Sequence, residues 1–120
     1  MELPKEGCLL RIYIGESDRH GSQELYEWLV MQARAQGLAG ATVLRGIMGY
    51  GAHSRIHTFK IERLSTDLPI IVEIIDTRDA IERYLDSVED SIHEGLVTLE
   101  NVQVHAYRWR TPPSTGQKPS

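Results

Sequence analysis

The sequence predicts an α+β domain of the ferredoxin-like class, with an antiparallel sheet and two helices on one of its faces. Segments that suit β-strands alternate along the chain with segments of helical periodicity. Their order is strand, helix, strand, and the same order then repeats. Two such units, each with its helix crossing over the same face, form the split βαβ arrangement, written βαββαβ.

The first unit occupies the N-terminal half of the chain. Cys8–Ile14 is an apolar run with β-branched and aromatic residues, which indicates a buried strand. A helix is expected over 22–36, with Ser22 as its N-cap and Gly37 as its C-terminal stop. Residues 41–46 predict the second strand. The helix would present an apolar stripe at helical spacing, made of Leu25, Trp28, Leu29 and Ala33.

The second unit begins with Leu68–Ile75, an almost continuous apolar run that is typical of a central strand. Asp76 and Thr77 are candidate caps for a helix that runs to about Glu94, and Gly95 would end it. The apolar stripe of this helix is Ile81, Tyr84, Leu85, Val88 and Ile92.

The remaining segments are a linker and the C-terminal part. Residues 56–64 alternate weakly and fit either a strand arm or an ordered loop. Residues 96–109 predict a short strand, a corner at Glu100 and Asn101, and a last strand from Val102 to about Tyr107. We expect one domain over 1–108, followed by a polar tail over 109–120 that is expected to be disordered.

Composition narrows the functional classes. The 120 residues carry a net charge of −4, which argues against a nucleic-acid-binding surface. No apolar run approaches the ~20 residues that span a bilayer, and the start MELPKEG lacks the apolar core of a signal peptide. We therefore expect a cytoplasmic protein without membrane insertion. The single cysteine, Cys8, excludes an internal disulfide and is expected to be a small buried hydrophobe.

The predicted sheet has one face without a covering layer. Both helices would pack on the same face, yet the strands are apolar nearly throughout and do not alternate cleanly. An exposed apolar sheet face of this kind indicates contact with another molecule. We therefore expect the protein to form an oligomer.

Glycines concentrate after the second predicted strand. Gly46, Gly49 and Gly51 form the pattern G-x-x-G-x-G, which differs from both the dinucleotide fingerprint and the Walker A loop. Such glycines can adopt positive φ and turn successive N–H groups toward an anion, or they can form a bend at a strand end. Arg45 and Arg55 flank them, and arginine suits phosphate or carboxylate unless both side chains are simply solvated.

Two other groups of polar residues are weaker candidates. His53 and His57 are four residues apart but lie in a segment without helical periodicity, so no metal site is predicted. The turn at 15–21 contains Glu16, Asp18 and His20, whose spacing fits local turn hydrogen bonds as well as acid–base chemistry. No pattern of a nucleophile with its base is present, and we predict that the protein is not an enzyme.

Several stretches together resemble a known family. They are LLRIYIGESDRHG, LYEWL, GLAGATVLRGIMGYG, SRIHT, DLPIIVEIID and EGLVTLENVQV, and they occur in order over about 9–107. This set is similar to the family called domain of unknown function 190, which is grouped with the PII-like signalling proteins. The resemblance implies a ferredoxin-like subunit and a compact PII-like homotrimer, in which a neighbouring subunit would cover the open sheet face.

The resemblance also implies a binding site. PII proteins bind adenine nucleotides in clefts between subunits, and their long T-loop leaves the second strand to report ligand state to a target protein. TVLRGIMGYG is similar to the base of that loop, and RWRT is similar to the arginine pair that reaches a neighbouring subunit's phosphates. The residues implied to bind ligand are Arg45, Gly46, Gly49, Tyr50 and Gly51 in the cleft, His53 and Arg55 in the loop, and Arg108 and Arg110.

The chain departs from the PII pattern in one informative place. The second PII glycine loop, TGxxGDGK, should fall near SIHEGLVT, where Gly95 alone matches and the phosphate-binding lysine is absent. This departure favours a ligand with fewer phosphates than ATP, or a different small anion. The tyrosine that PII proteins modify within the T-loop has no clear counterpart either.

The leading hypothesis is a non-enzymatic sensor of a nucleotide or another small anion. Ligand in the intersubunit cleft would order a T-loop-like segment at about 46–60 and change the affinity for a protein partner, with a membrane transporter or an enzyme as the target. No cofactor is expected, and an adenine nucleotide is the candidate ligand. The alternatives are a CutA-type metal-binding trimer that uses His53 and His57, and a small ferredoxin-like enzyme.

Overall fold

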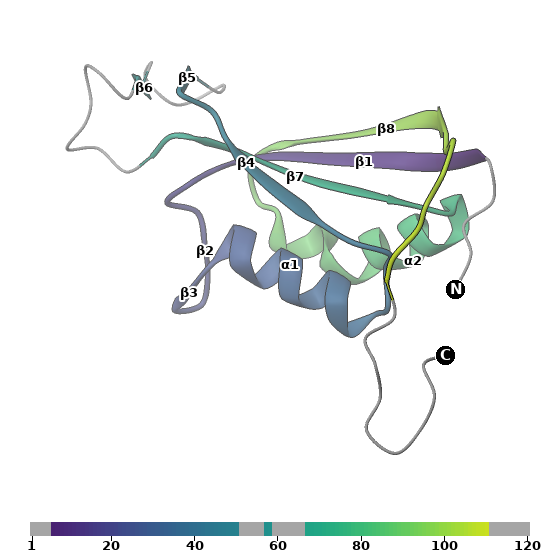
Figure 1. Ribbon diagram of the computed structural model, residues 1–120. Coiled ribbons are helices and arrows are strands. Elements are labelled where there is room, and N and C mark those ends of the chain that lie inside the picture. The colour runs from purple at the N-terminus through teal and green to yellow at the C-terminus, as the bar shows by residue number, and fades with distance from the viewer. Residues whose placement is uncertain (1–5, 51–56, 59–66, 111–120) are drawn as a thin grey trace.

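The structure is a computed structural model, and it describes residues 6–50, 57–58 and 67–110 (Figure 1). Helices and strands follow the predicted order, with four short strands added, which form the two pairs β2–β3 and β5–β6. The elements are β1 (Glu6–Gly15), β2 (Arg19–His20), β3 (Gln23–Glu24), α1 (Leu25–Ala35), β4 (Thr42–Arg45), β5 (Met48–Gly49), β6 (His57–Thr58), β7 (Pro69–Asp76), α2 (Arg78–Val88), a 3-10 turn (Glu89–Ser91) and β8 (Leu96–Gln103).

The main sheet has the strand order β4-β7-β1-β8, and every neighbouring pair is antiparallel. Both helices lie on the same face of this sheet (Figure 1). The ferredoxin-like arrangement with its antiparallel sheet and two helices is thereby confirmed. Because β1 and β4 both run antiparallel to β7, they run parallel to each other on either side of it.

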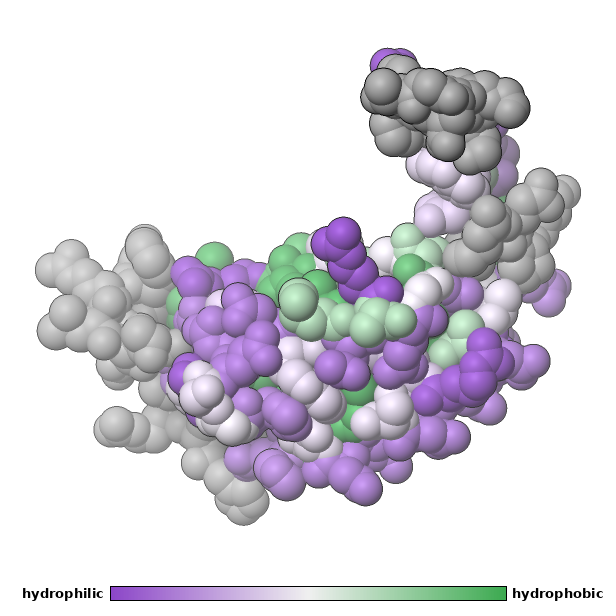
Figure 2. Space-filling model, turned by 90° about the horizontal axis from the view of Figure 1, so that it is seen from below, coloured by the Kyte–Doolittle hydropathy of each residue, from purple (hydrophilic) through white to green (hydrophobic). Residues whose placement is uncertain are grey.

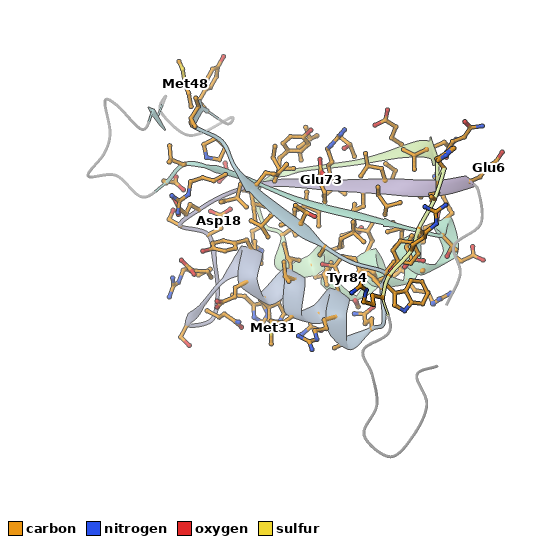
Figure 3. The ribbon with its side chains drawn as sticks, viewed as in Figure 1. Glu6, Asp18, Met31, Met48, Glu73 and Tyr84 are labelled. Atoms are coloured by element: carbon orange, nitrogen blue, oxygen red, sulfur yellow. The ribbon has the colours of Figure 1, made fainter. Side chains whose placement is uncertain are left out.

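The hydrophobic core lies between the sheet and the helices. Alternate residues of β1 and β7 point toward the helices, as the two-residue period of a strand requires. Tyr84 of α2 is fully buried there (Figure 3), and its hydroxyl donates to the carbonyl of Leu29 in α1 at 2.8 Å. Burial raises the pKa of Tyr84, so it stays a neutral donor. The core residues include Cys8, Leu10, Ile12, Ile14, Leu25, Leu29, Ala33, Val72, Ile74, Ile81, Tyr84 and Val88.

The opposite face of the sheet, here called the open face, has no helix over it (Figure 1). Its centre holds Arg11, whose guanidinium contacts Glu73 at 2.9 Å and Glu100 at 3.4 Å. Exposed apolar residues surround this charged group: Leu44, Ile75 and Leu96 are 44%, 40% and 56% exposed. The helix side differs, because its visible surface is mostly hydrophilic (Figure 2). The open face therefore presents exposed apolar residues without a covering helix, as surfaces that contact another molecule do.

The first helix starts later than predicted. Ser22 is not its N-cap, because α1 begins at Leu25 and Glu24 takes the cap position without a side-chain bond. Residues 19–24 instead form a small hairpin of β2 and β3, and the Ser22 carbonyl accepts a hydrogen bond from Arg19 at 2.7 Å. The predicted C-terminal stop is confirmed, because Gly37 follows the helix with a φ of 77°.

The predicted corner at Glu100 and Asn101 is wrong. Residues 96–103 form one continuous strand, in which Asn101 pairs with Cys8 and Glu100 pairs with Leu9. The long ladder with β1 outweighs the turn preference of these two polar residues. The second helix is also shorter than predicted, because α2 ends at Val88 and a 3-10 turn follows. Its predicted cap is confirmed, since the Thr77 hydroxyl accepts from the Ala80 N–H at 3.1 Å.

Residues 104–110, here called the strap, leave β8 and pass beside the start of β4 (Figure 1). The Tyr107 hydroxyl donates to the carbonyl of Ala39 at 2.9 Å, and the Tyr107 ring contacts Trp109 with 5.2 Å between centroids. Asp76 is buried close by, and its carboxylate accepts the N–H groups of Ala39 at 2.8 Å and Thr77 at 2.6 Å. The strap therefore fastens the end of the sheet at which β7 ends and α2 begins.

Candidate ligand site

The candidate site lies at the end of the sheet where β1 and β4 finish, here called the arm end. Gly15, the last residue of β1, pairs with Pro69, and Arg45, the last residue of β4, pairs with Ile70. The C-terminal residues of both strands therefore lie beside the start of β7. This topology brings the turn after Gly15 next to Arg45 and Gly46.

Backbone hydrogen bonds close this end tightly. The Glu16 N–H donates to the Leu68 carbonyl at 2.8 Å, and the Gly46 N–H donates to the Pro69 carbonyl at 2.7 Å. The Gly46 N–H is therefore engaged within the fold and is not turned toward an anion. The sequence allowed an anion cradle formed by glycines with positive φ. Neither Gly46 nor Gly49 has a positive φ, so these two residues do not form such a cradle.

Close packing explains both glycines. A Cβ atom on Gly46 would lie 2.9 Å from the Cγ of Pro69, and a Cβ on Gly49 would lie 3.0 Å from the same atom. Real Cβ atoms essentially never come within 3.0 Å, the contact at Gly49 lies at that limit, and a proline ring has little freedom to move away. The absence of a side chain at Gly46 and Gly49 thus lets the backbone approach the Pro69 ring closely at both positions.

Arg45 forms an ion pair with Glu16 across this end of the sheet. The two partners are unequally exposed, because the Arg45 side chain is 55% exposed and that of Glu16 is 12%. Glu16 belongs to the turn after β1, whose backbone is hydrogen-bonded to Leu68, and the guanidinium reaches its carboxylate from the surface. The sequence places Glu16 among turn residues, but no local pattern indicates this pairing, which follows from the parallel course of β1 and β4.

Further carboxylates surround the pair. Asp67 accepts the backbone N–H and the hydroxyl of Ser17 at 3.1 and 2.8 Å, and Asp18 accepts the Gly15 N–H at 3.1 Å. Burial raises the pKa of the Asp18 carboxyl, the bond from Gly15 opposes this rise, and the negative charges of Asp67 and Glu94 add to it. The turn that carries Glu16, the partner of Arg45, is therefore acidic.

A two-stranded arm projects from the arm end (Figure 1). Met48 pairs with Thr58 and Gly49 pairs with His57, so the strand-arm interpretation of the linker applies at least to 57–58. The arm presents exposed side chains near its base, with Met48 directed away from the sheet (Figure 3). The exposed fractions are 78% for Ile47, 59% for Met48 and 74% for Tyr50. The candidate residues Gly51, His53 and Arg55 lie outside the described part of the chain.

Arg108 and Arg110 lie elsewhere in the subunit. They belong to the strap, which is tied to Ala39 before the start of β4, whereas Arg45 stands at its end. Within one chain the structure therefore brings Arg45, Gly46 and Gly49 together but leaves the two strap arginines at the other end of the sheet. A site containing both groups requires a second subunit.

Other polar residues do not gather into a metal site within 6–50, 57–58 and 67–110. No three side chains of His, Cys, Asp or Glu come together there in a way that could hold a metal ion. His20 stacks on Trp28 of α1, with 3.8 Å between the ring centroids. Cys8 is free and buried, as predicted. In the same described part, no helix is long and apolar enough to cross a membrane.

Comparison with known proteins extends these observations. A UPF0166 protein of Aquifex aeolicus is 42% identical over 96 residues, which cover 80% of this chain and 90% of that protein. Among solved structures, CPII of Thiomonas intermedia K12 superposes with a TM-score of 0.64 at 16% identity, covering 84% of this chain and 90% of the other. It is described as a nitrogen regulatory PII-like protein bound to ADP, AMP and bicarbonate.

A second structural neighbour comes from a different group of proteins. The divalent ion tolerance protein CutA1 of Ehrlichia chaffeensis superposes with a TM-score of 0.53 at 10% identity, covering 87% of this chain and 86% of the other. At these identities the two structures show a shared fold. The family assignment comes from sequence, because residues 7–104 match the family DUF190 (Uncharacterized ACR, COG1993). The chain belongs to the DUF190 family, with the PII-like fold that its sequence predicted.

Proposed function

We propose that this protein is a non-enzymatic PII-like sensor that binds an adenine nucleotide, or another small anion, at the arm end. The observation that carries the proposal is the position of Arg45, a half-exposed cation at the base of a projecting arm. The same fold in CPII of Thiomonas intermedia occurs with ADP, AMP and bicarbonate. Arg45 would contact the anionic part of the ligand through its guanidinium, which suits phosphate and carboxylate.

The cleft would lie between two subunits of a homotrimer. The open face supplies an apolar surface for assembly, with the Arg11 ion pairs fixing its orientation. Arg108 and Arg110 stand at the opposite end of the sheet from Arg45 in one chain. They would enter the cleft from the neighbouring subunit, as the resemblance to PII proteins implies.

The arm would transmit the signal. Ile47, Met48 and Tyr50 are exposed at its base and next to Arg45, so a ligand there would restrict the arm and change what these side chains present. A partner protein that contacts the arm would then bind one ligand state better than the other, which is the requirement for coupling. A membrane transporter or an enzyme is the proposed target class.

Calorimetric titration with AMP, ADP, ATP and cyclic AMP, with and without bicarbonate, tests the ligand. At least one nucleotide should bind, and Arg45→Ala should weaken it by about tenfold or more, since a charge-assisted contact is lost. Arg83→Ala is the matched control, because Arg83 is an exposed arginine on α2. Absence of binding by every nucleotide tested contradicts the nucleotide proposal.

Mixed assemblies test whether the cleft is shared between subunits. Arg45→Ala chains and Arg108→Ala/Arg110→Ala chains should each bind weakly when assembled alone. After co-assembly at random, about a quarter of the clefts should regain all three arginines and wild-type affinity. Mixed assemblies that bind no better than either parent, or a wild-type protein that is monomeric at micromolar concentration by light scattering, rule out the shared cleft.

A further inference from the structure

The arm end contains a contact that bears directly on ligand choice, namely the pair of Arg45 with Glu16. We propose that Glu16 is the resident counter-ion of Arg45, which an anionic ligand must displace, so that Glu16 disfavours highly charged ligands. This inference rests on the proposed function for the assignment of Arg45 to the ligand. It adds a second residue that sets specificity through charge without any favourable contact to the ligand.

The backbone of Glu16 is fixed by hydrogen bonds, and its side chain is largely buried. Its N–H donates to the Leu68 carbonyl at 2.8 Å, and the following residue, Ser17, is bound through both its N–H and its hydroxyl to Asp67. The side chain of Glu16 is 12% exposed, so it has little room to swing into water. The backbone that carries this carboxylate is therefore fixed by the fold, and the low exposure of the side chain limits how far the carboxylate can move.

Arg45 is the partner that can move. Its side chain is 55% exposed, and among the described residues its guanidinium makes one contact, from Nη2 to Glu16 Oε2. A guanidinium carries five N–H donors, so most of them are left without an acceptor among the described residues. An anion can therefore approach Arg45 while Glu16 is still in place, or it can draw Arg45 away.

Glu16 opposes binding along either route. If Arg45 stays paired, the ligand's negative charge lies within a few ångströms of the Glu16 carboxylate and is repelled by it. If Arg45 turns to the ligand, Glu16 is left largely buried without its cation, which is costly. The charges that act on Asp18 in the same turn, those of Asp67 and Glu94, are negative as well and cannot replace the cation. The opposition grows with ligand charge, which favours ligands with few phosphates.

The test compares Glu16→Gln with wild type by calorimetry, using adenosine, AMP, ADP and inorganic pyrophosphate as probes. Glu16→Gln keeps the side-chain size and removes the charge. We expect affinity to rise about threefold for AMP and about tenfold for ADP and pyrophosphate, with adenosine unchanged, as a screened repulsion of this range predicts. The gain should shrink as salt is added.

Glu82→Gln is the matched control. It removes one carboxylate from an arginine ion pair, Arg78–Glu82, on the exposed side of α2 and changes the net charge equally. Its affinities should equal those of wild type. If Glu82→Gln raises affinity as much as Glu16→Gln, the effect comes from overall charge and the inference is overturned.

The remaining outcomes separate the inference from the proposed function. If ADP binds wild type and Glu16→Gln leaves its affinity unchanged or lowers it, Glu16 is not a competing counter-ion and the proposed function stands. If pyrophosphate binds more tightly to Glu16→Gln while no nucleotide binds either protein, the counter-ion role stands and the nucleotide proposal fails. If no probe binds either protein, both are overturned.

Discussion

The two ends of the sheet are fastened in different ways. At the strap end, the buried carboxylate of Asp76 accepts two backbone N–H groups, and Tyr107 ties the strap to Ala39. At the arm end, the backbone packs against Pro69 at Gly46 and Gly49. The ion pair there joins the largely buried Glu16 to the half-exposed Arg45. One end uses its charge to hold the fold together, and the other leaves its cation open to solvent.

This difference indicates that charged groups at the strap end serve mainly stability and that Arg45 at the arm end is available for binding. A buried carboxylate with two N–H donors is a fixed part of the structure, since losing it leaves both donors unsatisfied. Arg45 is half-exposed, so its ion pair contributes less to the stability of the fold than the Asp76 network does, and its guanidinium stays accessible to a ligand. We therefore expect substitutions at the strap end to change mainly stability, and charge substitutions at the arm end to change mainly ligand affinity.

The largest effect is expected from Asp76→Ala. The change leaves the N–H groups of Ala39 and Thr77 without their acceptor, and the free energy of unfolding should fall by about 2–4 kcal/mol. Asp76→Asn keeps one acceptor oxygen and should lose about half as much. Urea unfolding measures both, with the exposed Asp86→Ala on α2 as control. A loss below about 0.5 kcal/mol for Asp76→Ala contradicts the role of this carboxylate.

Gly46→Ala should have the next largest effect. Its Cβ would lie 2.9 Å from Pro69 Cγ, and the resulting overpacking should destabilise the protein by about 1–3 kcal/mol. The double variant Gly46→Ala/Pro69→Ala removes the clash, so the two changes should couple by about 1 kcal/mol in a double-mutant cycle. Gly40→Ala is the control, because nothing lies within 4 Å of its Cβ. If the effects of the two substitutions on the free energy of unfolding are strictly additive, the packing explanation is wrong.

Tyr107→Phe tests the strap directly. It removes the hydrogen bond to Ala39 from a partly exposed site and should lower the free energy of unfolding by about 0.5–1.5 kcal/mol. Tyr50→Phe removes the same hydroxyl from a side chain that is 74% exposed and should change stability by less than about 0.3 kcal/mol. Equal effects of the two variants are incompatible with a strap fastened by Tyr107.

The smallest effect concerns pH at the arm end. The folded-state pKa of Asp18 is raised, chiefly by burial, so the folded protein binds this proton more tightly than the unfolded chain. Asp18 therefore destabilises the fold at neutral pH, and this penalty fades as the pH falls through the folded-state pKa. Asp18→Asn keeps an acceptor for Gly15 and should be the more stable protein at pH 7.

Urea unfolding of both proteins between about pH 4 and 7 measures this difference. The advantage of Asp18→Asn should shrink toward the acid end of the range. A difference that stays constant with pH shows that Asp18 acts through hydrogen bonding alone.

Periodicity and end signals were sufficient for most of the fold. The stripes of Leu25, Leu29 and Ala33 and of Ile81 and Tyr84 are buried as predicted, because helical spacing places apolar residues on one side. The corner at Glu100 and Asn101 was wrong, since a turn preference was weighed without the long β1 ladder that opposes it. Ser22 failed as a cap because a hairpin precedes the helix.

The site was predictable only in part. The pattern of Arg45 with nearby glycines pointed to the C-terminal end of β4 and allowed either an anion cradle or a bend, whereas the structure shows Gly46 and Gly49 packed closely against the Pro69 ring. Pro69 is 20 residues away in sequence from Gly49, and Glu16 lies 29 residues from Arg45. Contacts of this kind depend on strand register, and no local pattern encodes them.

The sequence by itself determined the order of elements, the buried stripes and the family, because these depend on local periodicity and on residues that lie close together along the chain. The tertiary structure alone decided which strand ends lie side by side. It pairs Glu16 with Arg45 and places Arg108 and Arg110 at the other end of the sheet. The physical reason is that strand pairing sets these distances, and each pairing depends on all four strands of the sheet at once.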